Sequence, residues 1–333
     1  MKESDIRPEA LLKRYLELSV QDAERCFGND PRAEIPCVAC GGDDIAHAFN
    51  KHGFGYSRCN ACGTLYQNPR PTLAAFEAFY RDSESSNYWA EVFFPAVAEA
   101  RREKIFRPRV ERLAALCEAS GNPVQRLIDV GAGYGILLDE WRKRSPATQL
   151  VAVEPSSALA AECRAKGFEV VENIVEQVTG YDGFADLAVC FEVLEHVYDP
   201  ASFVQTLARL VRPGGTVFVS TLCIDGFDLQ TLWDQSNQIS PPHHINFLSV
   251  AGFQRLFERA GLVDVSVTTP GKLDVDIVRN ANRQHPELLS GQRFLQHLIQ
   301  DDRLAAAFQG FLAENRLSSH AWVSGITKAE VNP

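Results

Sequence analysis

The 333-residue chain has no long apolar run and no excess of positive charge, and each absence excludes a class of protein. No apolar stretch approaches the roughly 20 residues needed to span a bilayer. The N-terminal sequence, MKESDIRPEALLKRY, lacks the apolar core of a signal peptide. The formal net charge of −10 disfavours broad attraction to nucleic-acid phosphates. We therefore expect a cytoplasmic protein that binds neither membranes nor nucleic acid.

A glycine-rich turn between two apolar segments is the most informative feature that is present. Apolar residues at 127–130 lead into Gly131-Ala-Gly133-Tyr-Gly135, a helical segment follows, and a second apolar run ends at Glu154. This order predicts a βαβ unit whose glycines let a ligand approach the backbone and whose helix presents its N-terminal amides. An acidic residue about 20 positions after the turn is placed to accept hydrogen bonds from ribose hydroxyls. The pattern predicts a ligand with an adenosine-type ribose.

The glycine spacing differs from that of dinucleotide-binding proteins, because Ile136 stands where G-x-G-x-x-G has its third glycine. Together with Asp129, the segment DVGAGYG resembles motif I of the class I S-adenosylmethionine (SAM)-dependent methyltransferases. FEVLEHVYDP and VRPGGTVFVST extend the resemblance over residues 127–221. The resemblance implies SAM as the cofactor, with Glu154 on its ribose.

Predicted helices and strands alternate beyond this unit, which indicates a mostly parallel sheet covered on both faces. We expect helices at 157–166, 201–210 and 249–260, strands at 169–171, 185–191, 216–221, 262–268 and 319–327, and a turn at 212–215. Ligands in such folds bind at the carboxyl ends of the strands, which places Asn173 and Ile174 at the adenine and Phe191 and Glu192 on the cofactor's other side. The fold class is therefore α/β, and the resemblance implies the Rossmann-like seven-stranded class I methyltransferase sheet with an antiparallel last strand pair. The cofactor-binding residues in this interpretation are Asp129, Gly131, Gly133, Gly135, Glu154, Asn173, Ile174, Phe191 and Glu192.

Four of the nine cysteines form two C-x-x-C-G motifs, and these predict a metal site. Cys37, Cys40, Cys59 and Cys62 supply the four thiolates of a tetrahedral Zn²⁺ and leave no position for water, so the zinc is expected to be structural. Redox chemistry is the alternative, but no thioredoxin-like βαβ unit surrounds the motifs. His47 and His52, between the pairs, are expected at the surface.

The segment between the cysteines and the first strand is rich in aromatic and basic residues. We expect helices at 72–80 and 86–116, the second interrupted near Pro95 and Pro108. The aromatic residues Tyr88, Trp89, Phe93 and Phe94 either pack in a core or form a lid over cofactor and substrate, with Tyr88 then a candidate cofactor contact. The basic residues either form a solvated helix face or clamp an anionic, phosphorylated or nucleotide-linked substrate. They are Arg101, Arg102, Lys104, Arg107, Arg109 and Arg112.

The segment SPPHHINF at 240–247 is the best candidate for substrate chemistry. Methyl transfer to a hydroxyl requires loss of a proton, and a histidine on a proline-stiffened loop after the fifth strand can accept it. His243 and His244 are the candidate catalytic residues, with His244 preferred; a purely structural role for both is the alternative. Glu192, Glu195 and His196 would share one face of a helical turn. They are expected to form a hydrogen-bonded network at the cofactor pocket or, alternatively, to bind a divalent metal.

These motifs divide the chain into four predicted parts. They are an N-terminal helix (1–34), a zinc-binding module (35–72), a helical lid or linker (73–120) and a SAM-dependent methyltransferase domain (121–333) with a helical insertion at about 280–316.

The combination resembles bacterial methyltransferases of surface-polysaccharide, deoxysugar and natural-product pathways. It implies methyl transfer to a small molecule, with the hydroxyl of a saccharide or nucleotide-activated sugar as the acceptor. The zinc-containing sugar C-methyltransferases share the front half but carry a larger C-terminal domain. One alternative is an rRNA or tRNA methyltransferase with a zinc ribbon, opposed by the acidic balance and the lack of an N/D-P-P-Y/F segment. The other is a non-catalytic protein of the SAM-binding fold that regulates a partner.

Overall fold

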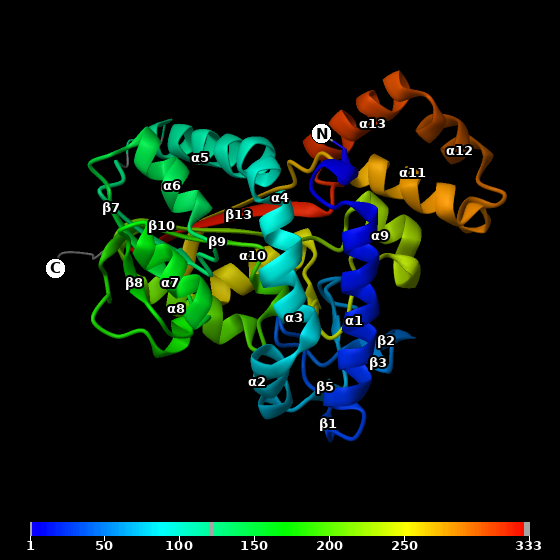
Figure 1. Ribbon diagram of the computed structural model, residues 1–333, viewed down its shortest axis with the longest axis horizontal. Helices are drawn as coiled ribbons and strands as arrows, with labels where there is room; N and C mark the ends of the chain where they lie inside the picture. Colours follow the sequence, from blue (N-terminus) through cyan, green and yellow to red (C-terminus); the bar gives the residue numbers. More distant parts are fainter. Residues whose placement is uncertain (1, 120, 122, 330–333) are drawn as a thin grey trace. The chain divides into compact units, whose positions relative to one another are not determined.

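The chain folds into two units, each built from separate stretches of the sequence. The computed structural model describes residues 2–119, 121 and 123–329 (Figure 1). Unit 1 comprises residues 1–97, 222–253 and 267–322, and unit 2 comprises 98–221, 254–266 and 323–333. The four parts predicted from motifs remain a prediction, because these units group the N-terminal residues with two later stretches.

The expected seven-stranded sheet is present and belongs mostly to unit 2. Its order is β12-β13-β10-β9-β6-β7-β8, and β6, β7, β8, β9 and β10 pair in parallel (Figure 1). The sheet strands are β6 (Arg126–Val130), β7 (Gln149–Val153), β8 (Glu169–Val171), β9 (Ala185–Phe191), β10 (Val211–Leu222), β12 (Leu262–Thr268) and β13 (His320–Thr327). Every residue of β9 is buried, as expected for a central parallel strand covered on both faces. The predicted fold class is confirmed.

Helices of unit 2 begin where the sequence supplies capping groups. The helices after the first strands are α6 (Ile136–Arg144), α7 (Ser157–Ala165), α8 (Pro200–Leu210) and α10 (Val250–Arg259). Ser156 caps α7 by accepting a hydrogen bond from Leu159 N, and Asp199 caps α8 by accepting one from Ala201 N at 3.0 Å. Gly135 precedes α6 in a left-handed conformation, so the glycine turn leads directly into the helix N-terminus.

Unit 1 contains a small antiparallel sheet in the order β11-β4-β3-β2. Its strands are β2 (Ile45–Lys51), β3 (Phe54–Cys59), β4 (Leu65–Gln67) and β11 (Asn246–Phe247). β1 (Arg32–Ala33) and β5 (Arg70–Pro71) form a separate pair. The helices of this unit include α1 (Glu9–Phe27), α2 (Leu73–Asp82), α3 (Glu84–Tyr88), α9 (Phe227–Leu232), α11 (Asp274–Gln284), α12 (Arg293–Gln300) and α13 (Asp302–Glu314). Helical structure thus begins at Asp274, ahead of the helical insertion predicted at about 280–316, which stays a prediction.

Residues 84–119 form a helical run that the two prolines modify without ending. After α3, π-helical turns at Trp89–Phe93 (η2) and Arg102–Phe106 (η3) alternate with α4 (Phe94–Arg101) and α5 (Arg107–Ala119). Each π turn ends just before a helix whose second residue is proline, Pro95 or Pro108. A proline has no N–H to donate, and a widened turn accommodates the missing hydrogen bond.

The predicted turn at 212–215 also differs from the structure, because β10 runs through these residues with an irregular register between Val211 and Thr216.

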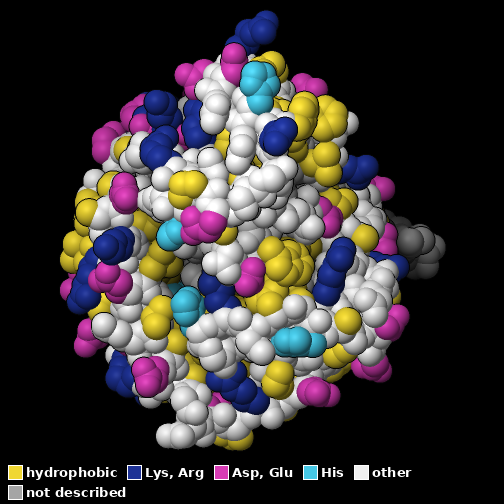
Figure 2. All heavy atoms as spheres, turned by 90° about the vertical axis from the view of Figure 1, so that its right-hand side faces the viewer, with side chains coloured by type: hydrophobic (Ala, Val, Ile, Leu, Met, Phe, Trp, Pro, Cys, Tyr) yellow, Lys and Arg dark blue, Asp and Glu magenta, His cyan; other side chains and the backbone are white. Residues whose placement is uncertain are grey.

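None of the helices in the described residues combines the length and apolar character needed to cross a membrane. Figure 2 shows one face of the molecule, on which basic and acidic side chains are interspersed around small groups of apolar side chains.

Candidate functional site

The three glycines of the turn after β6 all adopt positive φ angles, but they face different surroundings. A Cβ at Gly131 (φ +76°) would lie 2.5 Å from Val193 Cγ2, and one at Gly135 would lie 3.1 Å from Cys163 Sγ. A Cβ at Gly133 (φ +54°) would meet no atom within 4 Å. Gly131 and Gly135 are therefore required by packing, whereas Gly133 borders open space that a ligand can enter.

Glu154, at the end of β7, is tied to this turn. The carboxylate is 6% exposed, and its oxygens accept hydrogen bonds from Gly133 N at 2.8 Å and from Ser156 N at 2.9 Å. A carboxylate has about four lone-pair sites, so two backbone donors leave acceptor capacity for the ribose hydroxyls. Burial raises the pKa of Glu154 above its ordinary value.

Asp129 adds a second buried carboxyl beside the turn. It is 3% exposed in β6, and burial together with the charge of Glu154 raises its pKa to about 8. Two buried carboxyl groups close to one another favour a cationic ligand. The α-ammonium and sulfonium of SAM fit that requirement, and the residues of the turn therefore fit the cofactor.

The remaining predicted cofactor residues of unit 2 follow the next strands of the sheet. Ile174, after β8, is 43% exposed, and its N–H donates to the side-chain oxygen of Asn173. Phe191 ends β9, and Glu192 follows it with φ of 57°. The Glu192 carboxylate accepts hydrogen bonds from Ser220 Oγ at 2.7 Å and Arg109 Nη2 at 3.0 Å. These residues share with the glycine turn the carboxyl edge of the parallel strands.

Arg109 lies at this edge, although the sequence marked it only as one member of the basic run. Its guanidinium lies over the Phe191 ring, 5.2 Å from the centroid, while it pairs with Glu192. Arg102 and Arg107 pair with Glu140 at 2.8 and 2.9 Å. Ion pairs within unit 2 therefore account for these three members of the basic run. In the sequence, only its position in the basic run pointed to Arg109, because its partners Phe191 and Glu192 lie far along the chain.

The Glu192 to His196 segment does not form the helical turn that the spacing predicts. Glu192 is left-handed, and a short 3-10 turn, Leu194–His196 (η5), follows. Glu195 is 2% exposed and accepts a hydrogen bond from Thr221 Oγ1 at 2.7 Å, while burial and the charge of Glu192 raise its pKa. The two carboxyl groups thus bond to neighbouring hydroxyls of β10, which fits the expected hydrogen-bonded network, and the alternative of a divalent metal stays a prediction.

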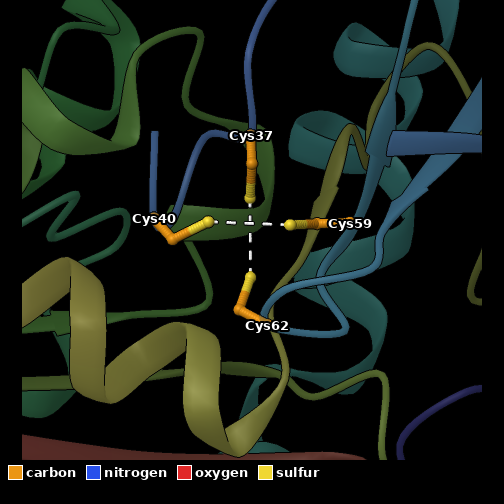
Figure 3. Close-up of side chains that lie close together, drawn as sticks. All are labelled: Cys37, Cys40, Cys59 and Cys62. Carbon is orange, nitrogen blue, oxygen red and sulfur yellow. Dashed lines mark hydrogen bonds between the residues drawn. The ribbon is translucent and has the colours of Figure 1, made fainter. Parts of the chain in front are cut away.

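The four predicted metal-ligating cysteines lie together in unit 1 (Figure 3). All four sulfurs lie within 4.8 Å of one another, with Cys37 to Cys62 at 3.5 Å and Cys40 to Cys59 at 3.6 Å. Sulfurs bound to zinc at about 2.3 Å in a regular tetrahedron are about 3.8 Å apart, so the cluster fits the ion. Gly41 and Gly63 donate to the carbonyls of Cys37 and Cys59 at 2.8 Å and close the two turns. His47 and His52 are exposed, as expected.

The two candidate histidines of unit 1 have different environments. His243 is 4% exposed, and its ring lies 4.8 Å from that of Phe79 and 5.1 Å from that of Tyr15. Its Nε2 is 3.0 Å from Ser85 Oγ, whose hydroxyl donates to Asp22 Oδ2 at 2.7 Å. Because a carboxylate only accepts, the Nε2–H of His243 donates to Ser85. His243 is thus part of the interior of unit 1.

His244 is half-buried and carries its proton on the other ring nitrogen. Its Nδ1 lies 2.6 Å from the Gln238 carbonyl, which can only accept, so Nδ1 is protonated. In the neutral ring Nε2 is then the basic nitrogen. Tyr88, the remaining predicted cofactor contact, belongs to unit 1 and packs against the cluster of Tyr15, Phe93 and Val97.

The parallel sheet, with a glycine turn after β6 and an acidic residue at the end of the neighbouring β7, defines an α/β protein whose strand ends fit an adenosine-containing ligand. Residues 97–267 match the methyltransferase-domain family, and the chain belongs to that family.

Curated relatives and solved structures agree with this membership. The ubiquinone biosynthesis O-methyltransferase of Escherichia coli O127:H6 is 37% identical over 160 residues, which cover 46% of this chain and 62% of the relative. The Albidiferax ferrireducens enzyme of the same name is 38% identical over 122 residues, 34% of this chain and 46% of its own length. The chain therefore spans less than two thirds of the length of these relatives. The fold is shared with the plantazolicin methyltransferase BpumL in complex with S-adenosylhomocysteine (SAH), at a TM-score of 0.50 and 11% identity over 77% of this chain and 94% of that one.

Proposed function

We propose that the protein is a SAM-dependent methyltransferase that transfers a methyl group to a hydroxyl of a small molecule. The observation that carries the proposal is the open space at Gly133 beside the buried carboxyl groups of Glu154 and Asp129. Glu154 would hold the ribose hydroxyls, and the acidic pair would balance the positive charges of the ligand. The cofactor supplies an electrophilic methyl group on its sulfonium.

A hydroxyl acceptor has to lose its proton as the methyl group arrives, and His244 is the proposed base. Its Nδ1–H is held by the Gln238 carbonyl, so in the neutral ring Nε2 is the basic nitrogen. The enclosed ring of His243 favours a structural role for that residue. The curated relatives named above are O-methyltransferases, which supports oxygen as the methylated atom.

For the acceptor we propose a saccharide or nucleotide-activated sugar, on the resemblance to polysaccharide and deoxysugar methyltransferases. Because the curated relatives are O-methyltransferases of ubiquinone biosynthesis, an acceptor of that pathway is the comparison substrate in any acceptor screen. For the cysteine cluster we propose one structural Zn²⁺, because four thiolates complete its coordination and leave no position for a reacting water.

Two conservative histidine variants test the base assignment, and each keeps the hydrogen bond that the structure shows. His244→Asn retains an amide donor near the position of Nδ1, and His243→Gln retains one near Nε2. We expect His244→Asn to lower kcat by about 10²- to 10⁴-fold, the usual contribution of a general base. SAH affinity, measured by calorimetry, should not change.

His243→Gln is the matched control and should keep turnover close to that of the wild type. If His243→Gln lost activity while His244→Asn kept it, the two roles would have to be exchanged. A protein that binds SAH but methylates neither sugar nucleotides nor acceptors of ubiquinone biosynthesis would favour the regulatory alternative. Salt-dependent RNA binding with methyl transfer to RNA would instead favour the rRNA or tRNA alternative.

A further inference from the structure

The histidine segment completes the sheet of the cysteine module. β11 begins two residues after His244 and pairs with β4 in the register Asn246 to Tyr66 and Phe247 to Leu65. Gln67 N also donates to the Ile245 carbonyl at 2.8 Å. The backbone directly after His244 is therefore held by the strand that follows the second cysteine motif.

Two buried side chains of the module bond to the histidine segment itself. Tyr56, which is 0% exposed in β3, donates its hydroxyl to the His244 carbonyl at 2.8 Å. Arg70, 1% exposed in β5, donates from Nη2 to Asn246 Oδ1 at 2.7 Å and to the Ile245 carbonyl at 3.5 Å. The module thus fixes the peptide that carries the proposed base as well as the residues after it.

The second cysteine pair lies where β3 ends and β4 begins, close in the chain to the residues that make these contacts. Cys59 is the last residue of β3, three positions after Tyr56, and Cys62 stands three positions before Leu65 of β4. Ser249, just beyond β11, donates its hydroxyl to the Cys62 carbonyl. A metal ion that joins this pair to Cys37 and Cys40 would hold the ends of both strands in place, and clustered thiolates without the ion would repel one another.

We propose that the four-cysteine module is the positioning scaffold of the histidine segment, with Tyr56 as the positioning residue for His244. The proposal rests on the catalytic role proposed for His244. A base must lie within hydrogen-bond reach of the proton it accepts, and small displacements of a reacting group cost large factors in rate. Metal occupancy in one part of unit 1 is thereby coupled to the geometry of the base in another.

Tyr56→Phe tests the proposal, and Tyr66→Phe is its matched control. Tyr66 is equally buried in the adjacent strand, but its hydroxyl donates to the Ile35 carbonyl at 3.2 Å and not to the histidine segment. Both variants remove one hydroxyl from the same small sheet. We expect Tyr56→Phe to lower kcat by about tenfold or more, with SAH affinity unchanged within about twofold. Tyr66→Phe should leave kcat close to that of the wild type.

A readout that does not depend on activity comes from the histidine ring and the backbone. In Tyr56→Phe, the ¹⁵N ring resonances of His244 should shift and the amides of residues 244–247 should exchange faster with solvent; Tyr66→Phe should show neither change. Removal of zinc from the full-length protein with a chelator should give the same changes while SAH binding is retained. Equal ring resonances and exchange rates in the two variants, or in metal-loaded and metal-free protein, would overturn the proposal.

The two readouts separate this inference from the proposed function. If His244→Asn proved fully active, the base assignment would fail, and the ring resonances and exchange rates would still decide whether the module positions the segment. If the resonances responded to Tyr56→Phe but kcat did not, the segment would be held by the module without serving catalysis, and the positioning role would be rejected.

Discussion

A substitution at Gly133 should abolish cofactor binding without unfolding the protein. Its φ of +54° lies in the left-handed region, and a Cβ there would meet no atom within 4 Å. Gly133→Leu should therefore cost about 1–2 kcal/mol of backbone strain and little in packing. The new side chain would fill the space beside Glu154, whose carboxylate accepts the Gly133 N–H.

Gly180→Leu is the matched control for the strain. Gly180 has φ of +81°, and a Cβ there would also meet no atom within 4 Å. It lies in the loop that precedes β9, at the amino end of the strand and so away from the carboxyl ends that carry the glycine turn. The two variants should lose similar thermal stability, about 2–4 °C for each kcal/mol.

Calorimetric titration with SAH separates the two effects. We expect Gly133→Leu to bind at least about 100-fold more weakly than the wild type, a loss of about 2.7 kcal/mol, and Gly180→Leu to bind normally. Zinc content should be the same in both proteins. Unchanged SAH affinity in a folded Gly133→Leu protein would show that the ligand does not occupy this space, and the proposed cofactor site would be wrong.

Two further predictions concern protons. Burial raises the pKa of Asp129 to about 8 and that of Glu154 above its ordinary value, and a cationic ligand lowers both; SAM binding should therefore release protons near neutral pH and tighten as the pH rises towards about 8. Calorimetry in buffers of different ionisation enthalpy measures this release, and proton uptake would contradict the assignment. Burial and the neighbouring Asp274 raise the pKa of Asp228, so the folded protein keeps a proton that the unfolded chain loses above about pH 4. The free energy of unfolding should therefore decrease as the pH rises above that value. The urea midpoint of the Asp228→Asn variant should decrease less with pH than that of the wild type. The same pH dependence in both proteins would contradict this explanation.

The strands were predictable because each is a short apolar run bounded by turn residues. β8, β9 and β12 have the predicted bounds, and the sheet has the seven strands that the resemblance implies. Prediction failed where a local rule had more than one solution. Pro95 and Pro108 were expected to interrupt a helix, and a π turn does interrupt the α-helix just ahead of each, but the sequence did not predict that the chain stays helical through these turns. Glu192 was placed on a helical turn by spacing, whereas its left-handed backbone separates it from the 3-10 turn that follows.

The candidate site also has parts that the sequence predicted and parts that it did not. Sequence spacing identified the cysteines and the residues around the glycine turn, and the structure assembles the four sulfurs and the acidic pair as those patterns predict. The roles assigned to these residues stay predictions. The pairing of Arg109 with Glu192 and the carboxyl pair of Asp228 and Asp274 had no signal in the sequence, since their members lie far apart along the chain.

The sequence by itself determined the fold class, the methyltransferase family and the identity of the cysteine cluster. Each depends on short motifs, such as the glycine turn and the two C-x-x-C-G pairs, in which residues a few positions apart have a spacing typical of one chemistry. Only the tertiary structure distinguished His243 from His244 and attached their segment to the cysteine module. Two adjacent histidines are equivalent in a sequence, but one packs among aromatic rings while the other donates to the Gln238 carbonyl. The pairing of β11 with β4 joins strands from distant parts of the chain, and its register depends on packing that no local pattern encodes.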